Sequence, residues 1–405
     1  MNIIHIFLSD PYKHLIKEDI IMITSHINRF FVIFSKNFRH TNVEAFETVI
    51  FLAVAHFFGC YNPKQLADYL GVGHQGFYAH LKELSLYTVK RLLLKFMVSL
   101  AAERMKAVLI KSDPTRSRAC ITISVDNSVI DRLGRMLPWT WSWYSGRWKK
   151  VLNGNDLLGI VITINGIAIP LHLLFCSKQG RGNTNKPDLL ISMLKDLIEE
   201  FEDHDIDLTA FPITMDSWFI SNPLNKRLHK LGFEKVLVAG KGNNTFTIGK
   251  KKQKASEWKK EIQLIADQWG IDVPFRRIKA YSPTFGCTVL YFYQKSTTRN
   301  YYLMDFSEKH MRGVEAWRIW KQHNIIEQFW KILKSVFKIK AMRPLGNGLY
   351  VALLIKVVAY LLAVILRNEK PYFKMSITQI MRRIRRDFDL ENILREHFHL
   401  EILIN

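Results

Sequence analysis

Three acidic residues occupy positions from which a chain can deliver carboxylates to a common site. Asp126 ends the apolar, β-rich run ITISVD, and Asp216 ends a second such run, PITMD. Glu327 lies in WKQHNIIEQFWKILK, residues 320–334, which has the periodicity of an amphipathic helix. An aspartate at the end of a buried strand is an unpaired charge unless a cation lies beside it. Each acid also has an ordinary alternative: a turn or helix cap for the aspartates, and a solvated helix flank for Glu327.

The helix expected over 320–334 presents several polar side chains on one side. At about 100° per residue, Trp320, His323, Glu327 and Lys334 fall within about 60° of one another, just beyond the apolar arc. Glu327 therefore lies at the edge of the buried stripe, with a histidine one turn before it and a lysine two turns after it.

The elements before this helix form a recognisable order. Apolar β-rich runs predict strands at 119–125, 157–164, 167–175, 211–215 and 235–240, with helices at 187–201 and 223–231. Asn-Gly at 165–166 predicts a tight hairpin turn. This order is typical of a mixed α/β sheet of the ribonuclease-H kind. In open α/β sheets the strand ends line the crevice in which chemistry occurs, and the two aspartates lie at the ends of the first and fourth strands.

The three acids resemble the acidic triad of the DDE transposases encoded by bacterial insertion sequences. The similarity covers residues 115–345, and it is closest to the cut-and-paste subgroup whose third acid lies in a Tyr-x2-Arg-x3-Glu-x6-Lys helix. Here that helix reads Trp320-x2-His323-x3-Glu327-x6-Lys334. Trp320 retains an aromatic plane in place of the tyrosine. His323 in place of the arginine is a larger change, because an unperturbed imidazole with a pKa of about 6.5 is only partly charged at neutral pH.

The resemblance implies a reaction and a cofactor. Asp126, Asp216 and Glu327 would be the catalytic residues and would bind two Mg²⁺ ions, which Mn²⁺ could replace, for phosphoryl transfer on DNA. The protein would bind the terminal inverted repeats of a transposon, cleave the ends and join them to target DNA. Lys334 would contact a phosphate of the transposon end, more weakly assisted by His323. Two alternatives remain: a metal-dependent nuclease or resolvase without strand transfer, and an inactive DNA-binding derivative.

The overall composition favours a nucleic-acid partner. The 405 residues include 58 Lys and Arg against 36 Asp and Glu, a net charge of +22. A polyanion is the expected partner of so basic a chain. Four widely spaced cysteines suggest neither a disulfide framework nor a zinc site, which fits a reducing, cytoplasmic compartment, and the resemblance implies a bacterial, nucleoid-associated protein. The N-terminus lacks a secretory signal pattern. The apolar run at 349–366 is interpreted as a buried helix rather than a membrane span, because Lys356 lies in its middle.

Residues 1–112 are expected to form a helical DNA-binding domain with a helix-turn-helix at 62–84. Two short helices flank Gly71-Val72-Gly73 there, and the second would present side chains to a major groove. His74, Gln75 and Tyr78 would meet base edges and Lys82 a phosphate. A plain helical hairpin is the alternative.

A ribonuclease-H-like catalytic domain with a mixed five-stranded sheet is expected over 113–240 and 301–345, interrupted at 241–300 by a basic, β-rich insertion. Residues 241–260 contain seven lysines and one glutamate, a density suited to phosphate contact. Trp258 and Trp269 are candidates either for stacking on an extruded base or for core packing. The residues of these regions expected to contact DNA, together with those of the 320–334 helix, are Lys250, Lys251, Lys252, Trp258, Trp320, His323, Lys331 and Lys334.

Two further segments combine aromatic and basic residues or basic residues alone. PWTWSWYSGRWKK, residues 138–150, would either cover a sheet face with its tryptophans or contact DNA, with Arg147, Lys149 and Lys150 binding phosphates. Residues 346–405 are expected to be a helical C-terminal region with a basic helical end at Arg382–Arg386. The resemblance implies that this region serves assembly of a homodimer on double-stranded DNA, with no membrane involved.

Overall fold

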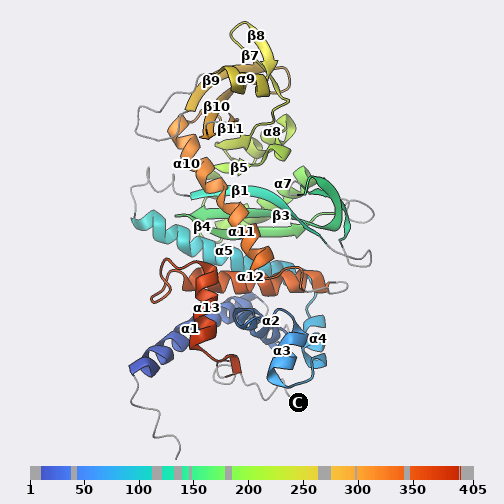
Figure 1. Cartoon of the computed structure of the whole chain (residues 1–405), viewed down its shortest axis with the longest axis vertical. Coiled ribbons are helices and arrows are strands. Elements are labelled where there is room, and N and C mark those ends of the chain that lie inside the picture. The colour runs from blue at the N-terminus through green and yellow to red at the C-terminus, as the bar shows by residue number, and fades with distance from the viewer. Residues whose placement is uncertain are drawn as a thin grey trace, which may run out of the picture. The chain divides into compact units, whose positions relative to one another are not determined.

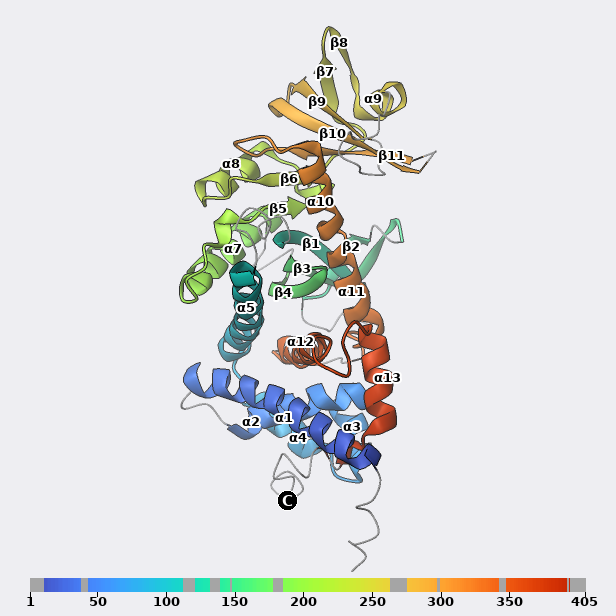
Figure 2. The same cartoon turned by 90° about the vertical axis from the view of Figure 1, so that its left-hand side faces the viewer.

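The computed structural model describes residues 11–37, 43–111, 121–131, 139–145, 148–177, 185–262, 275–296, 299–341, 347–391 and 393. Within it the chain forms two compact units. One, a helical unit, comprises residues 1–96, 130–140 and 330–405, and the other, a sheet unit, comprises residues 97–129 and 141–329. Figures 1 and 2 show helices in the first and a mixed sheet with helices in the second. The chain is therefore a mixed α/β protein.

The helical unit joins segments that the sequence analysis assigned to separate regions. Its helices come from both ends of the chain: α1 (Pro11–Asn37), α2 (Val43–Ala55), η2 (His56–Phe58), α3 (Pro63–Leu70), α4 (Gln75–Lys82), the start of α5 (Leu86–Lys111), the end of α11 (Ile325–Ser335), α12 (Gly348–Leu366) and α13 (Ile377–Asp387). The C-terminal helices therefore share a core with the N-terminal ones. The division between the units falls inside α5, between Phe96 and Met97, whereas the boundary expected from the sequence was at 112, just after α5 ends at Lys111.

Helix α12 forms the centre of the helical unit. It is long and apolar enough to cross a membrane, but its side chains are buried against the other helices of the unit. The interpretation of 349–366 as a buried helix is thus confirmed. Its one charged side chain, Lys356, is fully buried, and its ammonium donates to His56 Nε2 at 3.0 Å and to the Phe337 carbonyl at 2.8 Å. These bonds offset the cost of removing the cation from water.

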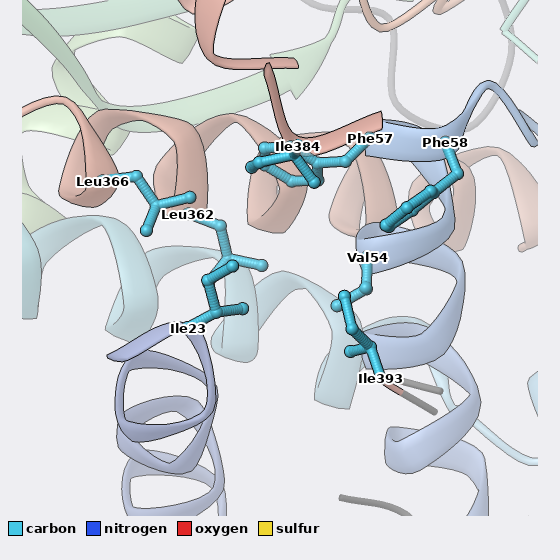
Figure 3. A pocket seen from close by; sticks show the side chains of 8 residues that line it. All are labelled: Ile23, Val54, Phe57, Phe58, Leu362, Leu366, Ile384 and Ile393. Atoms are coloured by element: carbon cyan, nitrogen blue, oxygen red, sulfur yellow. The ribbon is translucent and has the colours of Figure 1, made fainter. Parts of the chain in front are cut away.

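A small gap remains between helices of this unit (Figure 3). Eight apolar side chains line it, seven from α1, α2, η2, α12 and α13 and one from the segment that follows α13. They are Ile23, Val54, Phe57, Phe58, Leu362, Leu366, Ile384 and Ile393. Because none of these side chains carries a polar group, the gap offers no group for chemistry and is a packing feature.

The two short helices expected at 62–84 are present. Asn62 caps α3 by accepting from the Gln65 backbone N–H at 3.0 Å, and Pro63 occupies the first turn. Gly71 ends α3 at φ +69°, a left-handed conformation that favours glycine, and α4 follows within four residues. The turn and both helices therefore follow from local sequence signals.

The sheet unit is built on one sheet of eleven strands. They are β1 (Ile121–Asp131), β2 (Trp141–Ser145), β3 (Lys150–Ile164), β4 (Ile167–Phe175), β5 (Ile213–Met215), β6 (Val236–Ala239), β7 (Thr245–Ile248), β8 (Lys251–Lys254), β9 (Phe275–Ser282), β10 (Gly286–Ser296) and β11 (Arg299–Asp305). The order is β2-β3-β1-β5-β6-β11-β10-β9-β7-β8, with β4 also paired to β3. Strands β1, β5 and β6 are parallel, whereas the β3–β4 hairpin turns at Asn165 and Gly166, both with positive φ.

The size of this sheet corrects the expectation of five strands. Strand β11 pairs antiparallel with β6, so that the β-rich segment continues the sheet instead of folding as a separate body. The edge of β6 has unpaired peptide groups until β11 joins it, and satisfying them favours this arrangement.

Helices cover both faces of the extended sheet. Side chains alternate along β10, so Val289 and Tyr291 pack with α10 (Gly313–His323), whereas Leu290 and Phe292 pack with α9 (Ala255–Glu261). In Figure 2, α7 (Lys186–Glu202) and α8 (Asn222–Lys230) lie on the side of β5 and β6 opposite α10. The sheet is therefore buried on two faces, which explains the near-continuous apolar runs in its strands.

Candidate active site

The register of the parallel strands places Asp126 and Asp216 side by side. Val125 of β1 and Met215 of β5 are Cα partners, Asp126 is the next residue of β1, and Asp216 directly follows β5. The expectation that Asp126 ends its strand is wrong, because β1 continues to Asp131. Neighbouring strands lie about 4.8 Å apart. The two carboxylates predicted to share a site therefore leave the sheet at adjacent positions, where β5 ends.

Local hydrogen bonds orient each of the two carboxylates. Asp126 is half-buried, and its Oδ1 accepts from the Asn127 backbone N–H at 2.7 Å. Asp216 is exposed and caps the short helix η5 (Ser217–Phe219), with Oδ1 accepting from the Ser217 N–H at 2.6 Å. The capping role considered for Asp216 is thus present, through its Oδ1. Both side chains remain in contact with solvent.

Asp305, at the end of β11, shows the contrasting structural case. Its carboxylate is fully buried and accepts from the Tyr291 hydroxyl at 2.6 Å, the Met311 N–H at 2.8 Å and the Ser307 N–H at 3.0 Å. Three donors inside the protein satisfy it, which is typical of an acid that holds a loop together.

The helix expected over 320–334 is divided in the structure. Helix α10 ends at His323, Asn324 follows as its C-cap, and α11 begins at Ile325. Trp320 is buried among the aromatic side chains packed on the sheet, and His323 is buried beside it. Glu327 is exposed in the first turn of α11. Trp320, His323, Glu327 and Lys334 therefore do not form one solvent-facing stripe. The reason is that the last turn of α10 packs against the sheet.

His323 forms a buried connection to the strands that carry the aspartates. Its Nδ1 lies 2.9 Å from Thr214 Oγ1, and the Thr214 hydroxyl donates to the Ile123 carbonyl at 3.1 Å. With that hydroxyl proton engaged, the imidazole N–H donates to Thr214. Thr214 precedes Asp216 by two residues, and Ile123 precedes Asp126 by three. The network therefore joins the end of α10 to both acid-bearing strands.

This position corrects the expectation that His323 contacts a DNA phosphate. Burial lowers the pKa of His323 to about 3, so the ring is neutral at physiological pH. It stacks on Trp320 with a centroid separation of 4.3 Å, and Trp320 itself is only 8% exposed. Both side chains are held inside the protein, so the expected contact of Trp320 with DNA is corrected as well.

The described part of the chain brings two of the three predicted acids together. Glu327 follows His323 by four residues, across the break between α10 and α11, and His323 is hydrogen-bonded to Thr214 of β5. Within the described residues, however, no group of three or more His, Cys, Asp or Glu side chains is placed so that it could hold a metal ion. The backbone register therefore places Asp126 and Asp216 next to each other, and Glu327 lies on a separate element, α11.

The residues predicted to read DNA on α4 are accessible. His74, Gln75, Tyr78 and Lys82 are all exposed, and Tyr78 is 41% exposed. The opposite side of this helix is buried through Phe77. The short helix therefore presents a polar and aromatic face to solvent.

The predicted basic contacts are also at the surface where the structure describes them. Lys149 and Lys150 are exposed at the start of β3, while Arg147 lies outside the described residues. Lys334 of α11 is half-buried. The exposed lysines of the β7–β8 hairpin and α11 are Lys250, Lys251, Lys252 and Lys331. One of these, Lys251, pairs with Glu261 at 2.6 Å, which offsets part of its charge.

Trp258 is not available for stacking on a base. It is 7% exposed, packs in the cluster on the α9 face, and donates from Nε1 to the Phe246 carbonyl at 3.1 Å. The core-packing alternative is therefore correct for this side chain, because its indole has a buried partner. Trp269 lies outside the described residues.

Sequence reasoning missed a buried ion pair beside the acidic pair. Lys186, at the start of α7, lies 2.6 Å from Asp156 of β3, and Asn127 donates to the same carboxylate at 2.8 Å. The available signal was Asp156 itself, a charged residue immediately before the apolar run LLGIVITI. The lysine partner follows only from the fold.

The fold and site define a mixed α/β protein with two aspartates at neighbouring positions of adjacent parallel strands, Asp126 within β1 and Asp216 directly after β5. No protein-family model and no curated protein matches the sequence. Among solved structures, the chain is similar to piggyBac transposase in a synaptic complex with hairpin DNA, at 14% identity and a TM-score of 0.46, covering 88% of this chain and 73% of that one.

Argonaute from Marinitoga piezophila gives a lower similarity. Its complex with 5′ OH guide RNA matches at 13% identity and a TM-score of 0.23, and its complex with guide RNA and target DNA matches at 12% identity and the same TM-score. Each of these two matches covers 58% of this chain and 29% of the Argonaute chain.

Proposed function

We propose that this protein is a DNA transposase that binds transposon ends, cleaves them and joins them to target DNA, using Asp126, Asp216 and Glu327. The observation that carries the proposal is the parallel register, which puts Asp126 of β1 beside Asp216 at the end of β5. The central position of β1 between β3 and β5 supports a ribonuclease-H-like arrangement for this part of the sheet.

The donor set suits Mg²⁺, since carboxylate oxygens are the protein ligands that hard divalent cations prefer. Asp126 and Asp216 would hold the ions from the sheet, and Glu327 would complete the set from α11. When bound, two such ions supply a polarised phosphate and an activated nucleophile. Because Glu327 is not grouped with the aspartates in the described residues, the proposal includes its approach to them when metal and DNA bind.

The remaining surface would hold the DNA. The exposed face of α4 would read the end sequence, while the β7–β8 hairpin, the start of β3 and Lys334 would contact phosphates, consistent with a net charge of +22. A homodimer on paired ends, two Mg²⁺ ions replaceable by Mn²⁺, and a cytoplasmic, nucleoid-associated location belong to the same proposal.

The test uses the full chain and labelled DNA carrying the inverted repeats that flank its gene. Asp126→Ala, Asp216→Ala and Glu327→Ala should each abolish Mg²⁺-dependent cleavage and leave end binding intact, because they remove metal ligands and not the basic surface. Asp188→Ala is the matched control, since Asp188 is another surface carboxylate of this unit, paired with Arg227, and its variant should cleave normally.

Two results would count against the proposal. Cleavage at the normal rate by the Glu327 variant would remove that residue from the site. Cleaved ends that never become joined to a target plasmid would identify a nuclease without strand transfer.

A further inference from the structure

A buried ion pair lies beside the two aspartates. The Lys186 ammonium is 2.6 Å from Asp156 Oδ2, and the two side chains are 12% and 1% exposed. Removing two charges from water is costly, so replacing such a pair with apolar residues is often neutral or stabilising. The presence of this buried pair therefore calls for a role besides stability.

One set of contacts leads from the ion pair to Asp126. Asp156 Oδ1 accepts from the Asn127 side-chain amide at 2.8 Å. The backbone N–H of Asn127 in turn donates to Asp126 Oδ1 at 2.7 Å. Asn127 is thus held by its side chain while its main chain orients the neighbouring carboxylate. A change in Asp156 would be passed to Asp126 through one residue.

A second set of contacts leads from the same lysine towards Asp216. The Lys186 ammonium lies over the Trp218 ring, 4.6 Å from its centroid, and 5.4 Å from that of Trp143. A cation over the face of a tryptophan is attracted by the ring quadrupole. Trp218 belongs to η5, the turn that Asp216 caps. The position of Trp218 therefore helps to fix the backbone from which Asp216 projects.

We infer that Lys186 and Asp156 are positioning residues that set the geometry of Asp126 relative to Asp216, and through it the affinity of the acidic pair for a divalent cation. The inference rests on the proposed function, because it treats the two aspartates as metal ligands. Residues that orient metal ligands typically change metal affinity by 10–100-fold when replaced. Lys186 is suited to this role because one ammonium contacts elements leading to both aspartates.

The test measures Mn²⁺ binding to the full chain by titration calorimetry. Lys186→Met should weaken the binding about 10–100-fold, and Lys186→Arg, which can still pair with Asp156 and stack on Trp218, should restore most of it. Asn127→Ala, which leaves the ion pair intact but cuts its link to Asp126, should also weaken binding. In cleavage assays the half-saturating Mg²⁺ concentration should rise in parallel, while DNA-end binding without metal stays normal.

Lys235→Met is the matched control. Lys235 forms an ion pair of the same length, 2.6 Å, with Glu315 in the same unit, and neither residue contacts Asp126 or Asp216 through the bonds described above. Its variant should bind Mn²⁺ as the unaltered protein does. Should Lys186→Met not fold, as judged by circular dichroism, the Arg and Asn127 variants carry the test.

The two levels of proposal fail differently. In one outcome Asp126→Ala abolishes Mn²⁺ binding, but the folded Lys186→Met and Asn127→Ala variants bind Mn²⁺ at full affinity. This outcome would overturn the positioning role alone. An unaltered protein that binds no Mn²⁺, with or without transposon-end DNA, would overturn the proposed function and this inference with it.

Discussion

Acid should destabilise the sheet unit through His323, by an amount that can be worked out from its burial. The pKa of this imidazole is about 3 in the folded protein, against about 6.5 in an unfolded chain. The unfolded state therefore binds a proton that the folded state does not, at every pH between these values. The stabilisation is fully present above pH 6.5 and is lost as the pH falls, by about 1.4 kcal/mol per unit. At pH 4.5 the loss is roughly 2.7 kcal/mol.

The perturbation that isolates this residue is His323→Asn, which keeps an N–H donor near the position of Nδ1 but does not titrate. Urea unfolding, followed by circular dichroism at half-unit steps from pH 7.5 to 4.5, gives the free energy of unfolding of both proteins. The difference between them cancels the other titrating groups. Relative to the variant, the unaltered protein should lose about 1.4 kcal/mol of unfolding free energy for each pH unit below 6.5.

A difference that stays constant across this pH range would show that His323 is not held neutral against Thr214, and the reasoning about its network would be wrong. The same burial reverses what the family pattern suggested for this position. An arginine at this position would place a permanent charge beside Thr214, so His323→Arg should lower stability and should not strengthen end binding.

Three other outcomes follow from the packing and the surface. Trp258→Ala should lower the free energy of unfolding by about 3–5 kcal/mol, measured in urea, with DNA-end binding unchanged under folding conditions, because the indole is buried. Gly240→Ala should lower the melting temperature, since its Cβ would lie 2.0 Å from the Tyr302 ring. Gly76→Ala is the control and should not lower it, because nothing lies within 4 Å of the added Cβ. An equal decrease in melting temperature for both variants would contradict this reasoning. Lys82→Ala should weaken DNA binding for all sequences alike and reduce the slope of log affinity against log salt by about one, and a sequence-selective loss would argue for base contact instead.

Much of the architecture could be predicted because its signals are local. The apolar runs before Asp126 and Asp216 predicted two strands, although the first continues to Asp131, while Asn165-Gly166 predicted the hairpin turn and Gly71 the end of α3. The adjacency of the two aspartates was predicted correctly, but its cause is the register of β1 with β5 and not a shared strand end, because Asp126 lies within β1.

The errors concern contacts between residues far apart in sequence. The helical periodicity of residues 320–334 is continuous, and the segment contains neither glycine nor proline. Nothing local therefore indicates that the helix is divided at Asn324. The burial of His323 depends on Thr214, 109 residues away. Likewise, β11 joins β6 across the whole basic segment, and no periodicity within either strand indicates which partner it will choose.

The pairing of β11 with β6 also bears on any attempt to shorten the protein. Residues 241–300 look removable in the sequence, as an appendage to a complete catalytic sheet. Excising them together with β11 would leave the backbone amides and carbonyls of Val236–Ala239 open along one side, where a second molecule could add a strand. A truncated chain would therefore be prone to self-association, and the segment contributes to keeping molecules apart from one another.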